Sequence, residues 1–205
     1  MNTIFVTGTG TGVGKTFVTC AVLTALRQDG TPVLARKLVE SFDPDDAAPR
    51  DSELLGAASR ESPETVCSRQ VPLAMAPPNA AALLGLPPFS IEDLCRDLTQ
   101  HGTAVAGWCF VEGAGGIASP LASDGDNRDA VDALNPECTL VVAHAGLGTL
   151  NDCRLVHDYL ADRPHQFFLN RHDANDPIHV DNLAALRRFA EVSTSVAEVT
   201  AQLIP

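Results

Sequence analysis

The sequence predicts an α/β fold in which a parallel sheet is flanked by helices on both faces, giving three layers. Short apolar segments of strand character alternate with segments of helical periodicity along the chain, and this alternation is typical of parallel strands joined by crossover helices. The strand segments are almost continuously apolar, as expected when both faces of a strand are buried. No compositional break or internal repeat interrupts the 205 residues, so we expect one domain spanning 1–205.

Local signals predict the elements of the first half. The β-branched run at 3–7 ends at Gly8 and predicts a buried first strand. A helix, a strand and a second, shorter helix are expected next, at 16–28, 32–39 and 51–59. Segment 63–89 is rich in proline and has no clear period, which predicts a loop with one helical turn at 80–84.

The second half contains a capping signal and several apolar runs. Ser90 and Asp93 have the spacing of a variant capping box, which predicts a helix over 90–100. The apolar run 104–111 predicts a strand. The remaining elements expected are helices at 127–134, 151–160 and 179–190, strands at 139–143 and 166–169, and a weak strand at 192–196.

Charge and composition exclude several classes of partner. A formal net charge of −12 disfavours nucleic acid and anionic membranes, which both reward a basic surface. No apolar run approaches the roughly 20 residues of a membrane span, and the N-terminus lacks the basic start of a signal peptide. The six cysteines show no CxxC pair and no metal-ligand spacing with His, as in a reducing compartment. A cytoplasmic location is therefore expected.

The most specific motif runs from Gly8 to Thr16 and reads GTGTGVGKT. It lies between a predicted strand and a predicted helix, the context of a phosphate-binding loop, although five residues rather than four separate Gly8 from Gly14. Small residues let backbone amides approach phosphates, Lys15 reaches the outer phosphates, and the Thr16 hydroxyl coordinates Mg²⁺. The alternative is an ordinary Gly-rich turn.

Glu112 follows the apolar strand at 104–111 and precedes a run of glycines. An acidic residue at the carboxyl end of a neighbouring strand is where phosphate-loop enzymes place a metal ligand. Glycines at this point let the backbone approach a bound ligand closely. The alternative is a tight turn with a solvated Glu.

Only two of the 14 basic residues are lysines, Lys15 and Lys37. Lys37 lies near the end of the second predicted strand, where it either faces solvent or neutralises charge on a transferring phosphoryl group. Residues 148–151 follow another strand and lead into a helix. Their amides suit a carboxylate, and the alternative is a simple Asn N-cap.

Taken together these residues resemble the dethiobiotin synthetase family, whose members are ATP-dependent enzymes of the deviant phosphate-loop class. The resemblance covers about residues 3–170. The motifs that carry it, in order, are TGTGTGVGKT (7–16), Lys37 with Ser41, Asp51 at the start of a short helix, MAP (75–77), VEGAGG (111–116) with Pro120 and Leu121, and GLGTLN (146–151). The five-residue gap in the phosphate loop is the spacing of this family.

The resemblance implies a P-loop NTPase-like, Rossmann-like fold and a homodimer that binds 7,8-diaminononanoate, CO₂ and MgATP. It also implies the reaction: one amine is carbamylated, the carbamate takes the γ-phosphoryl group, and the second amine closes a ureido ring, yielding dethiobiotin in biotin biosynthesis. The partners are thus small molecules and a second copy, with no nucleic acid or membrane.

Carried over position by position, the resemblance implies four groups of site residues. Those for the reaction are Lys37, Lys15, Thr11 and Ser41. Those for the nucleotide are Gly10, Gly12, Val13, Gly14, Lys15, Thr16, Glu112, Gly115 and Asn170, the last at the position of a base-contacting Asn. Those for the organic substrate are Lys37, Ser41, Gly148, Thr149, Leu150 and Asn151, and those for Mg²⁺ are Thr16, Asp51 and Glu112.

Two positions depart from the family pattern. Leu38 and Phe42 stand where the family usually has Pro and Gly, and the bulky Phe42 challenges the placement of Ser41. The alternative function is therefore a degenerate, nucleotide-binding regulatory relative without synthetase activity. An amide-forming ligase of the cobyrinate type would need a glutamine-hydrolysing domain that does not fit, and a partitioning ATPase is disfavoured by the acidity.

Overall fold

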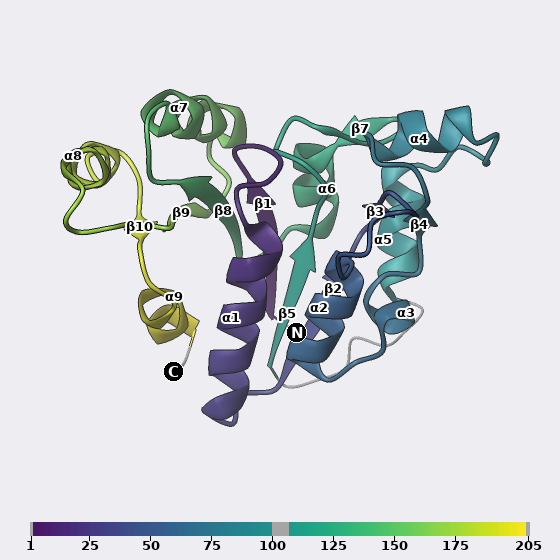
Figure 1. The fold of residues 1–205 in the computed structure, drawn as a ribbon, viewed down its shortest axis with the longest axis horizontal. Helices are drawn as coiled ribbons and strands as arrows, with labels where there is room; N and C mark the ends of the chain where they lie inside the picture. The colour runs from purple at the N-terminus through teal and green to yellow at the C-terminus, as the bar shows by residue number, and fades with distance from the viewer. Residues whose placement is uncertain (1, 100–106, 204–205) are drawn as a thin grey trace.

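Six parallel strands form the central sheet of the molecule (Figure 1). The computed structural model describes residues 2–99 and 107–203. Within these residues the strand order is β10-β9-β8-β1-β5-β2, and each pair of neighbours is parallel. The strands are β1 (Asn2–Gly8), β2 (Val33–Lys37), β5 (Trp108–Glu112), β8 (Cys138–His144), β9 (His165–Asn170) and β10 (Val192–Ser193). The predicted parallel α/β fold is confirmed.

Helices pack on both faces of this sheet because successive strand residues point to opposite sides. In β1, Ile4 and Val6 belong to one core cluster and Phe5 to the other. The cluster of Ile4 and Val6 takes side chains from α1 (Lys15–Gln28), α2 (Asp51–Ser59), α3 (Pro63–Val66) and α9 (Val196–Leu203). The cluster of Phe5 takes them from α4 (Pro77–Leu83), α5 (Ile91–Thr99), α6 (Asn127–Leu134), α7 (Thr149–Leu160) and α8 (Pro177–Leu186).

The segment between α2 and α5 contains more regular structure than the sequence predicted. The proline-rich stretch holds α3, α4 and a short strand, and the helical turn expected at 80–84 is α4, which begins at Pro77. Proline suits the first turn of a helix because its missing N–H would have no partner there. The remaining strands form two small pairs, parallel β3 (Glu40–Ser41) with β4 (Gln70–Val71), and antiparallel β6 (Pro120–Ala122) with β7 (Gly125–Asp126).

Several predicted boundaries shift. The strand expected over 32–39 ends at Lys37, because the chain then leaves the sheet and pairs with β4 instead. The helix expected over 179–190 is α8, which ends at Leu186. Helices α2 and α6 have the predicted bounds. Position 100 of the predicted helix 90–100 and positions 104–106 of the predicted strand 104–111 lie outside the described residues.

The C-terminal helix α9 was not predicted. The weak strand expected at 192–196 shortens to the two residues of β10, and α9 starts at Val196. Val199 and Leu203 are buried in the same core cluster as α1. The indole Nε1 of Trp108 donates a hydrogen bond of 2.9 Å to the carbonyl of Leu203, so the end of the chain is tied to β5.

The parallel arrangement brings the carboxyl ends of the strands to one edge, at the top of Figure 1. The loops that follow β1, β2, β5, β8 and β9 therefore meet along this edge, where ligands bind in open α/β sheets. No helix among residues 2–99 and 107–203 is long and apolar enough to cross a bilayer.

Candidate active site

The loop between β1 and α1 has the backbone of a phosphate-binding loop. Gly12 and Gly14 have φ angles of 77° and 96°, values that side chains other than glycine rarely allow. A Cβ on Gly8 would lie 2.7 Å from Val13 Cγ2, so the loop also requires glycine at its start. Gly14 caps α1 without a side-chain hydrogen bond. The free N–H groups of the first helical turn are therefore available to an anion.

Lys15 is a buried cation at this helix start. Its Nζ lies 3.3 Å from the carbonyl oxygen of Gly10, and burial lowers the pKa of Lys15 below its ordinary value. Within the described part of the chain, no carboxylate lies at ion-pair distance from Lys15, whereas Lys37 has two. A buried ammonium without an ion pair favours binding of an anion beside it.

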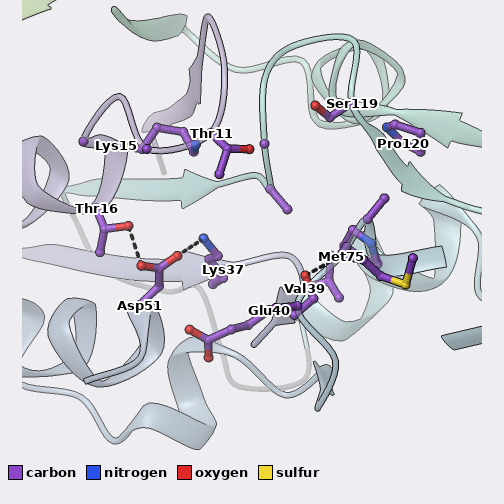
Figure 2. Close-up of a pocket in the computed structure, with 18 of the residues that line it drawn as sticks. Thr11, Lys15, Thr16, Lys37, Val39, Glu40, Asp51, Met75, Ser119 and Pro120 are labelled. Carbon is purple, nitrogen blue, oxygen red and sulfur yellow. Dashed lines mark hydrogen bonds and ion pairs between the residues drawn. The ribbon is translucent and has the colours of Figure 1, made fainter. Parts of the chain in front are cut away.

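Four side chains from separate elements, Thr16, Lys37, Asp51 and Glu112, meet next to this loop, and we call them the Lys37 cluster; Figure 2 shows the first three. Lys37 at the end of β2 places its Nζ 2.5 Å from Asp51 Oδ2 and 2.7 Å from Glu112 Oε1. Thr16 Oγ1 lies 2.8 Å from Asp51 Oδ1 and 2.9 Å from Glu112 Oε1. The first turns of α1 and α2 and the ends of β2 and β5 thus supply one residue each.

Neighbouring opposite charges determine the protonation states of Lys37 and Asp51. Burial alone would lower the pKa of Lys37, but the carboxylates of Glu112 and Asp51 outweigh it and raise this pKa above its usual value. Burial alone would raise the pKa of Asp51, yet the Lys37 ammonium and the Thr16 hydroxyl hold it below its usual range. Near neutral pH, Lys37 is therefore an ammonium group and Asp51 a carboxylate.

The oxygen donors of the cluster suit Mg²⁺. Thr16 offers one hydroxyl, and the carboxylates of Asp51 and Glu112 both lie at hydrogen-bond distance from it. Mg²⁺ prefers oxygen ligands and commonly takes one or two carboxylates together with phosphate oxygens. In the described ranges, no three His, Cys, Asp or Glu side chains form a metal site, which excludes a closed all-protein cage there but not this set.

A cleft of about 700 Å³ opens above the Lys37 cluster (Figure 2). Thr11, Gly12, Gly14, Lys15 and Thr16 line it on the phosphate-loop side. The facing wall includes Lys37, Ser41 and Asp51, and Gly115 lies on a third side. Other lining residues were not predicted as site residues: Phe17, Val39, Glu40, Ala74, Met75, Ala76, Pro77, Ala114, Ser119 and Pro120. Of these, Met75, Ala76 and Pro77 form the MAP motif, and Ala114 and Pro120 belong to the motifs at 111–116 and 120–121.

Ser41 reaches the cleft although the bulky Phe42 follows it. The hydroxyl of Ser41 donates a hydrogen bond of 2.7 Å to the carbonyl of Met75. The amide of Phe42 donates to Val71 in β4, and the guanidinium of Arg50 lies 5.2 Å from the Phe42 ring centroid. The ring therefore packs beside Arg50, and Ser41 keeps its place. Leu38, the other departure, is buried in the core.

Glu40, which precedes Ser41 in β3, supports the Lys37 cluster by binding the first turn of α2. Its buried carboxylate accepts hydrogen bonds from the amide of Ser52 at 3.1 Å and from the Ser52 hydroxyl at 2.6 Å. This contact holds the first turn of α2, where a negative group is favoured. Asp51, one residue before Ser52, is thereby directed toward Thr16 and Lys37.

Two groups of predicted residues lie elsewhere. Gly148, Thr149, Leu150 and Asn151 form the start of α7 and do not line the cleft with Lys37. The neighbouring Leu147 is 79% exposed. Asn170, at the end of β9, is buried and bonded to the phosphate loop. Of the remaining predicted residues, Gly10 and Val13 belong to that loop and Glu112 lies beneath the cleft.

A parallel sheet with a glycine loop and lysine after its β1 strand, and with acidic residues converging on the loop's threonine, defines a P-loop NTPase. Solved structures share this fold: the MinD cell division protein of Aquifex aeolicus (TM-score 0.52, 19% identity, 94% of this chain and 80% of that one) and a putative plasmid partition protein of Borrelia burgdorferi B31 (TM-score 0.55, 10% identity, 93% and 84%). At these identities the likeness concerns the fold alone.

Sequence relatives identify the family of this chain more specifically than the fold does. A family model described as an AAA domain matches residues 2–199. The chain is 39% identical over 155 residues to the ATP-dependent dethiobiotin synthetase BioD of Caulobacter sp. (strain K31), covering 74% of this chain and 66% of that protein. It is 38% identical over 167 residues to the protein of the same name from Anaeromyxobacter sp. (strain K), covering 80% and 72%. This chain belongs to the family of ATP-dependent dethiobiotin synthetases, as the sequence predicted.

Proposed function

We propose that this chain catalyses the ATP-dependent conversion of 7,8-diaminononanoate and CO₂ to dethiobiotin. The observation that carries the proposal is the Lys37 cluster, which joins a phosphate loop, two carboxylates and a second lysine in one cleft. The names of its relatives give the product, dethiobiotin, and the dependence on ATP, and the sequence resemblance implies the substrates. The aligned segments cover 66% and 72% of these two relatives, and the activity of this chain is proposed on that basis.

The chemistry has three steps. An amine of the substrate adds to CO₂ and loses a proton, giving a carbamate. A carbamate oxygen attacks the γ-phosphorus of ATP, so that a C–O–P bond forms, the bond to ADP breaks and ADP leaves. The second amine attacks the carbamate carbon, expels inorganic phosphate and closes the five-membered ureido ring with loss of a proton.

Each step depends on positioning and charge neutralisation, the main tasks of a phosphoryl-transfer site. Lys15 and the α1 amides bind the outer phosphates of ATP. Lys37, with Thr11 and Ser41 on the cleft wall, faces the carbamate and the transferring phosphoryl group. The Lys37 ammonium is a compact charge, which suits neutralisation of a trigonal phosphoryl group.

Thr16, Asp51 and Glu112 are proposed to hold Mg²⁺. The ion would supply positive charge to the phosphate oxygens of ATP. The same two carboxylates bind Lys37 in the structure, so a cation held there would compete with Lys37 for them. The Lys37 ammonium carries three N–H donors, of which any that is not bound to a carboxylate would be available to the substrate.

Residues 148–151 are proposed to bind the carboxylate of the substrate in the cleft of a second copy. They lie at the start of α7, where Gly148 and Asn151 are exposed and Thr149 is buried, and they do not line the cleft of their own chain. The free amides of this helix start suit a carboxylate. Leu147 and Leu155 are 79% and 62% exposed on the same segment, as expected of a surface that a homodimer covers.

The test is phosphate release from MgATP in the presence of diaminononanoate and bicarbonate, with each omitted in turn. The synthetase proposal predicts release only when both are present, together with one ureido product per phosphate. Release that is independent of the diamine would indicate another NTPase. Nucleotide binding without any release would favour the degenerate regulatory relative.

A further inference from the structure

The end of β9 is bonded to the phosphate loop across 157 positions of the sequence. Asn170 is the last residue of β9 and is 4% exposed. Its Nδ2 donates a hydrogen bond of 2.9 Å to the carbonyl oxygen of Val13. The buried side chain of Asn170 therefore binds the backbone of the loop and does not line the cleft.

The orientation of the Asn170 amide is fixed at both ends. Its Oδ1 accepts a hydrogen bond of 3.0 Å from the backbone N–H of Arg171. The reverse orientation would set the NH₂ group against the N–H of Arg171 and Oδ1 against the carbonyl of Val13, which places two like groups in contact. The NH₂ group therefore points at the loop.

The contact at Val13 also fixes the next amide. A trans peptide is planar, with its C=O and N–H on opposite sides. When Asn170 holds the carbonyl of Val13, the N–H of Gly14 must point the other way. Gly14 lines the cleft, and its φ of 96° is a conformation reserved for glycine. The bond to Asn170 thus determines which side of the Val13–Gly14 peptide, the carbonyl or the N–H, faces the cleft.

Packing reinforces this restraint. A Cβ at Gly14 would lie 2.2 Å from Asn170 Nδ2, so the side chain of Asn170 occupies the space that any other residue at Gly14 would need. Lys15 follows directly and starts α1. The position of the α1 N-terminus and of the Lys15 ammonium therefore depends on the same contact.

We infer that Asn170 is a positioning residue of the phosphate loop, acting through Val13 to orient the Gly14 amide toward the bound phosphates. The inference rests on the proposed function only in assigning the loop to nucleotide phosphates. It differs from a base-contacting role, because the restraint acts on any polyphosphate, with or without a base.

The experiment compares MgATP with inorganic tripolyphosphate, which has no base. Dissociation constants are measured by calorimetry for the wild-type chain, Asn170→Leu and Asn170→Ala. Leu has the same branching and the same number of side-chain heavy atoms without a donor, so one variant of the pair avoids an internal cavity. We expect both ligands to bind about tenfold more weakly, by equal factors, since one buried hydrogen bond and the loop order it maintains are lost.

Asn182→Leu is the matched control. Asn182 is also buried, and its Nδ2 donates to the carbonyls of Ala145 and Gly146, so the same kind of bond is lost away from the phosphate loop. Its variant should bind both ligands as the wild-type chain does. Unfolding by denaturant, followed by circular dichroism, reports whether each variant is folded.

Four outcomes would overturn the inference. Weaker ATP binding with unchanged tripolyphosphate binding would make Asn170 a base contact. Unchanged binding of both would make it a purely structural amide, and equal losses in Asn182→Leu would mean that the effect is not local. A wild-type chain that binds neither ligand would contradict both the inference and the proposed function, whereas binding without synthetase turnover would contradict the function alone.

Discussion

Two regions predicted to serve one reaction are built in different ways. The Lys37 cluster joins four side chains from four elements at distances of 2.5 to 2.9 Å within one chain. The start of α7 presents residues 148–151 away from that cleft, beside the exposed Leu147. The first region comes together within one chain, whereas the proposed carboxylate-binding role of the second would require the cleft of a second copy.

The difference follows from topology. The Lys37 cluster lies around β1, β2 and β5, which are neighbours in the sheet, so parallel pairing brings their ends together. The α7 start follows β8, on the other side of β1. In the proposed homodimer, the α7 of a second copy would lie at the cleft, and a substrate that carries both a diamine and a carboxylate would link the two regions.

The largest effect is expected from Lys37→Arg, which tests the first region. The planar guanidinium does not fit where a compact ammonium is held between Asp51 and Glu112. We expect the turnover number to fall by about 10²- to 10³-fold while MgATP affinity is largely kept. Lys15→Ala, by contrast, should weaken both ATP binding and turnover. Near-normal turnover of Lys37→Arg, in steady-state assays, would remove Lys37 from the reaction.

A smaller effect is expected from Glu112→Gln. The buried amide replaces one of the carboxylates proposed for Mg²⁺ and leaves Lys37 paired with Asp51 alone. The Mg²⁺ concentration for half-maximal activity should rise at least about tenfold. Glu61→Gln is the control, because Glu61 pairs with Arg36 outside the cleft. An unchanged Mg²⁺ requirement in Glu112→Gln would exclude this carboxylate as a ligand.

Mixing two impaired variants tests the second region. Asn151→Asp sets a carboxylate at the exposed start of α7, where it would repel the carboxylate of the substrate. Alone, it should raise the KM for diaminononanoate. When it is unfolded and refolded with Lys37→Arg, random pairing gives about a quarter of sites with both regions intact. Activity at low substrate should recover accordingly.

The control for this mixing is a pair of variants within one cleft, Lys37→Arg with Lys15→Ala. Their mixture should stay inactive, because no site then escapes both changes. If Asn151→Asp and Lys37→Arg also fail to restore activity in a mixed dimer, the start of α7 does not serve the cleft of a second copy.

The smallest effect concerns pH. Burial lowers the pKa of His165 below its ordinary 6.5, and the neighbouring His157 adds to the effect. The folded chain therefore binds fewer protons than the unfolded chain, and the free energy of unfolding should fall as the pH drops below 6.5. Because the pKa of Asp51 is lowered from 3.8, a second loss in the free energy of unfolding follows only below pH 3.8.

Denaturant unfolding at a series of pH values separates these two windows. His165→Gln should reduce the loss in free energy of unfolding that begins just below pH 6.5. Asp51→Asn should reduce only the loss below pH 3.8. A variant that leaves its own window unchanged would show that its group does not carry the predicted proton linkage.

The sequence predicted the fold from patterns that are local or topological, and the family resemblance implied that Thr16, Lys37, Asp51 and Glu112 belong to one site. Apolar runs defined the parallel strands, and parallel strands place Lys37 and Glu112 at one edge. The bounds of α2 agreed with prediction. Helix α9 was missed because residues such as Val196 and Val199 favour strands, and packing on α1 overrides that preference.

Contacts between distant segments were beyond prediction. The place of Ser41 depends on Phe42 stacking with Arg50 and pairing with β4. The contact between Asn170 and Val13 depends on the relative position of two strand ends that β8 separates. Neither leaves a periodic signal, since each is decided by tertiary packing. The role of each predicted site residue, and the extent of the domain over 1–205, stay predictions.

The most direct test of the proposed reaction traces one oxygen atom from CO₂ to the released phosphate. The proposed sequence of bonds transfers one carbamate oxygen, derived from CO₂, to the phosphate that leaves when the ring closes. With C¹⁸O₂, diaminononanoate and MgATP in unlabelled water, mass spectrometry of early product should show phosphate carrying a single ¹⁸O. Phosphate that carries no oxygen from CO₂ would mean that ATP is simply hydrolysed in the cleft, and the central claim would be wrong.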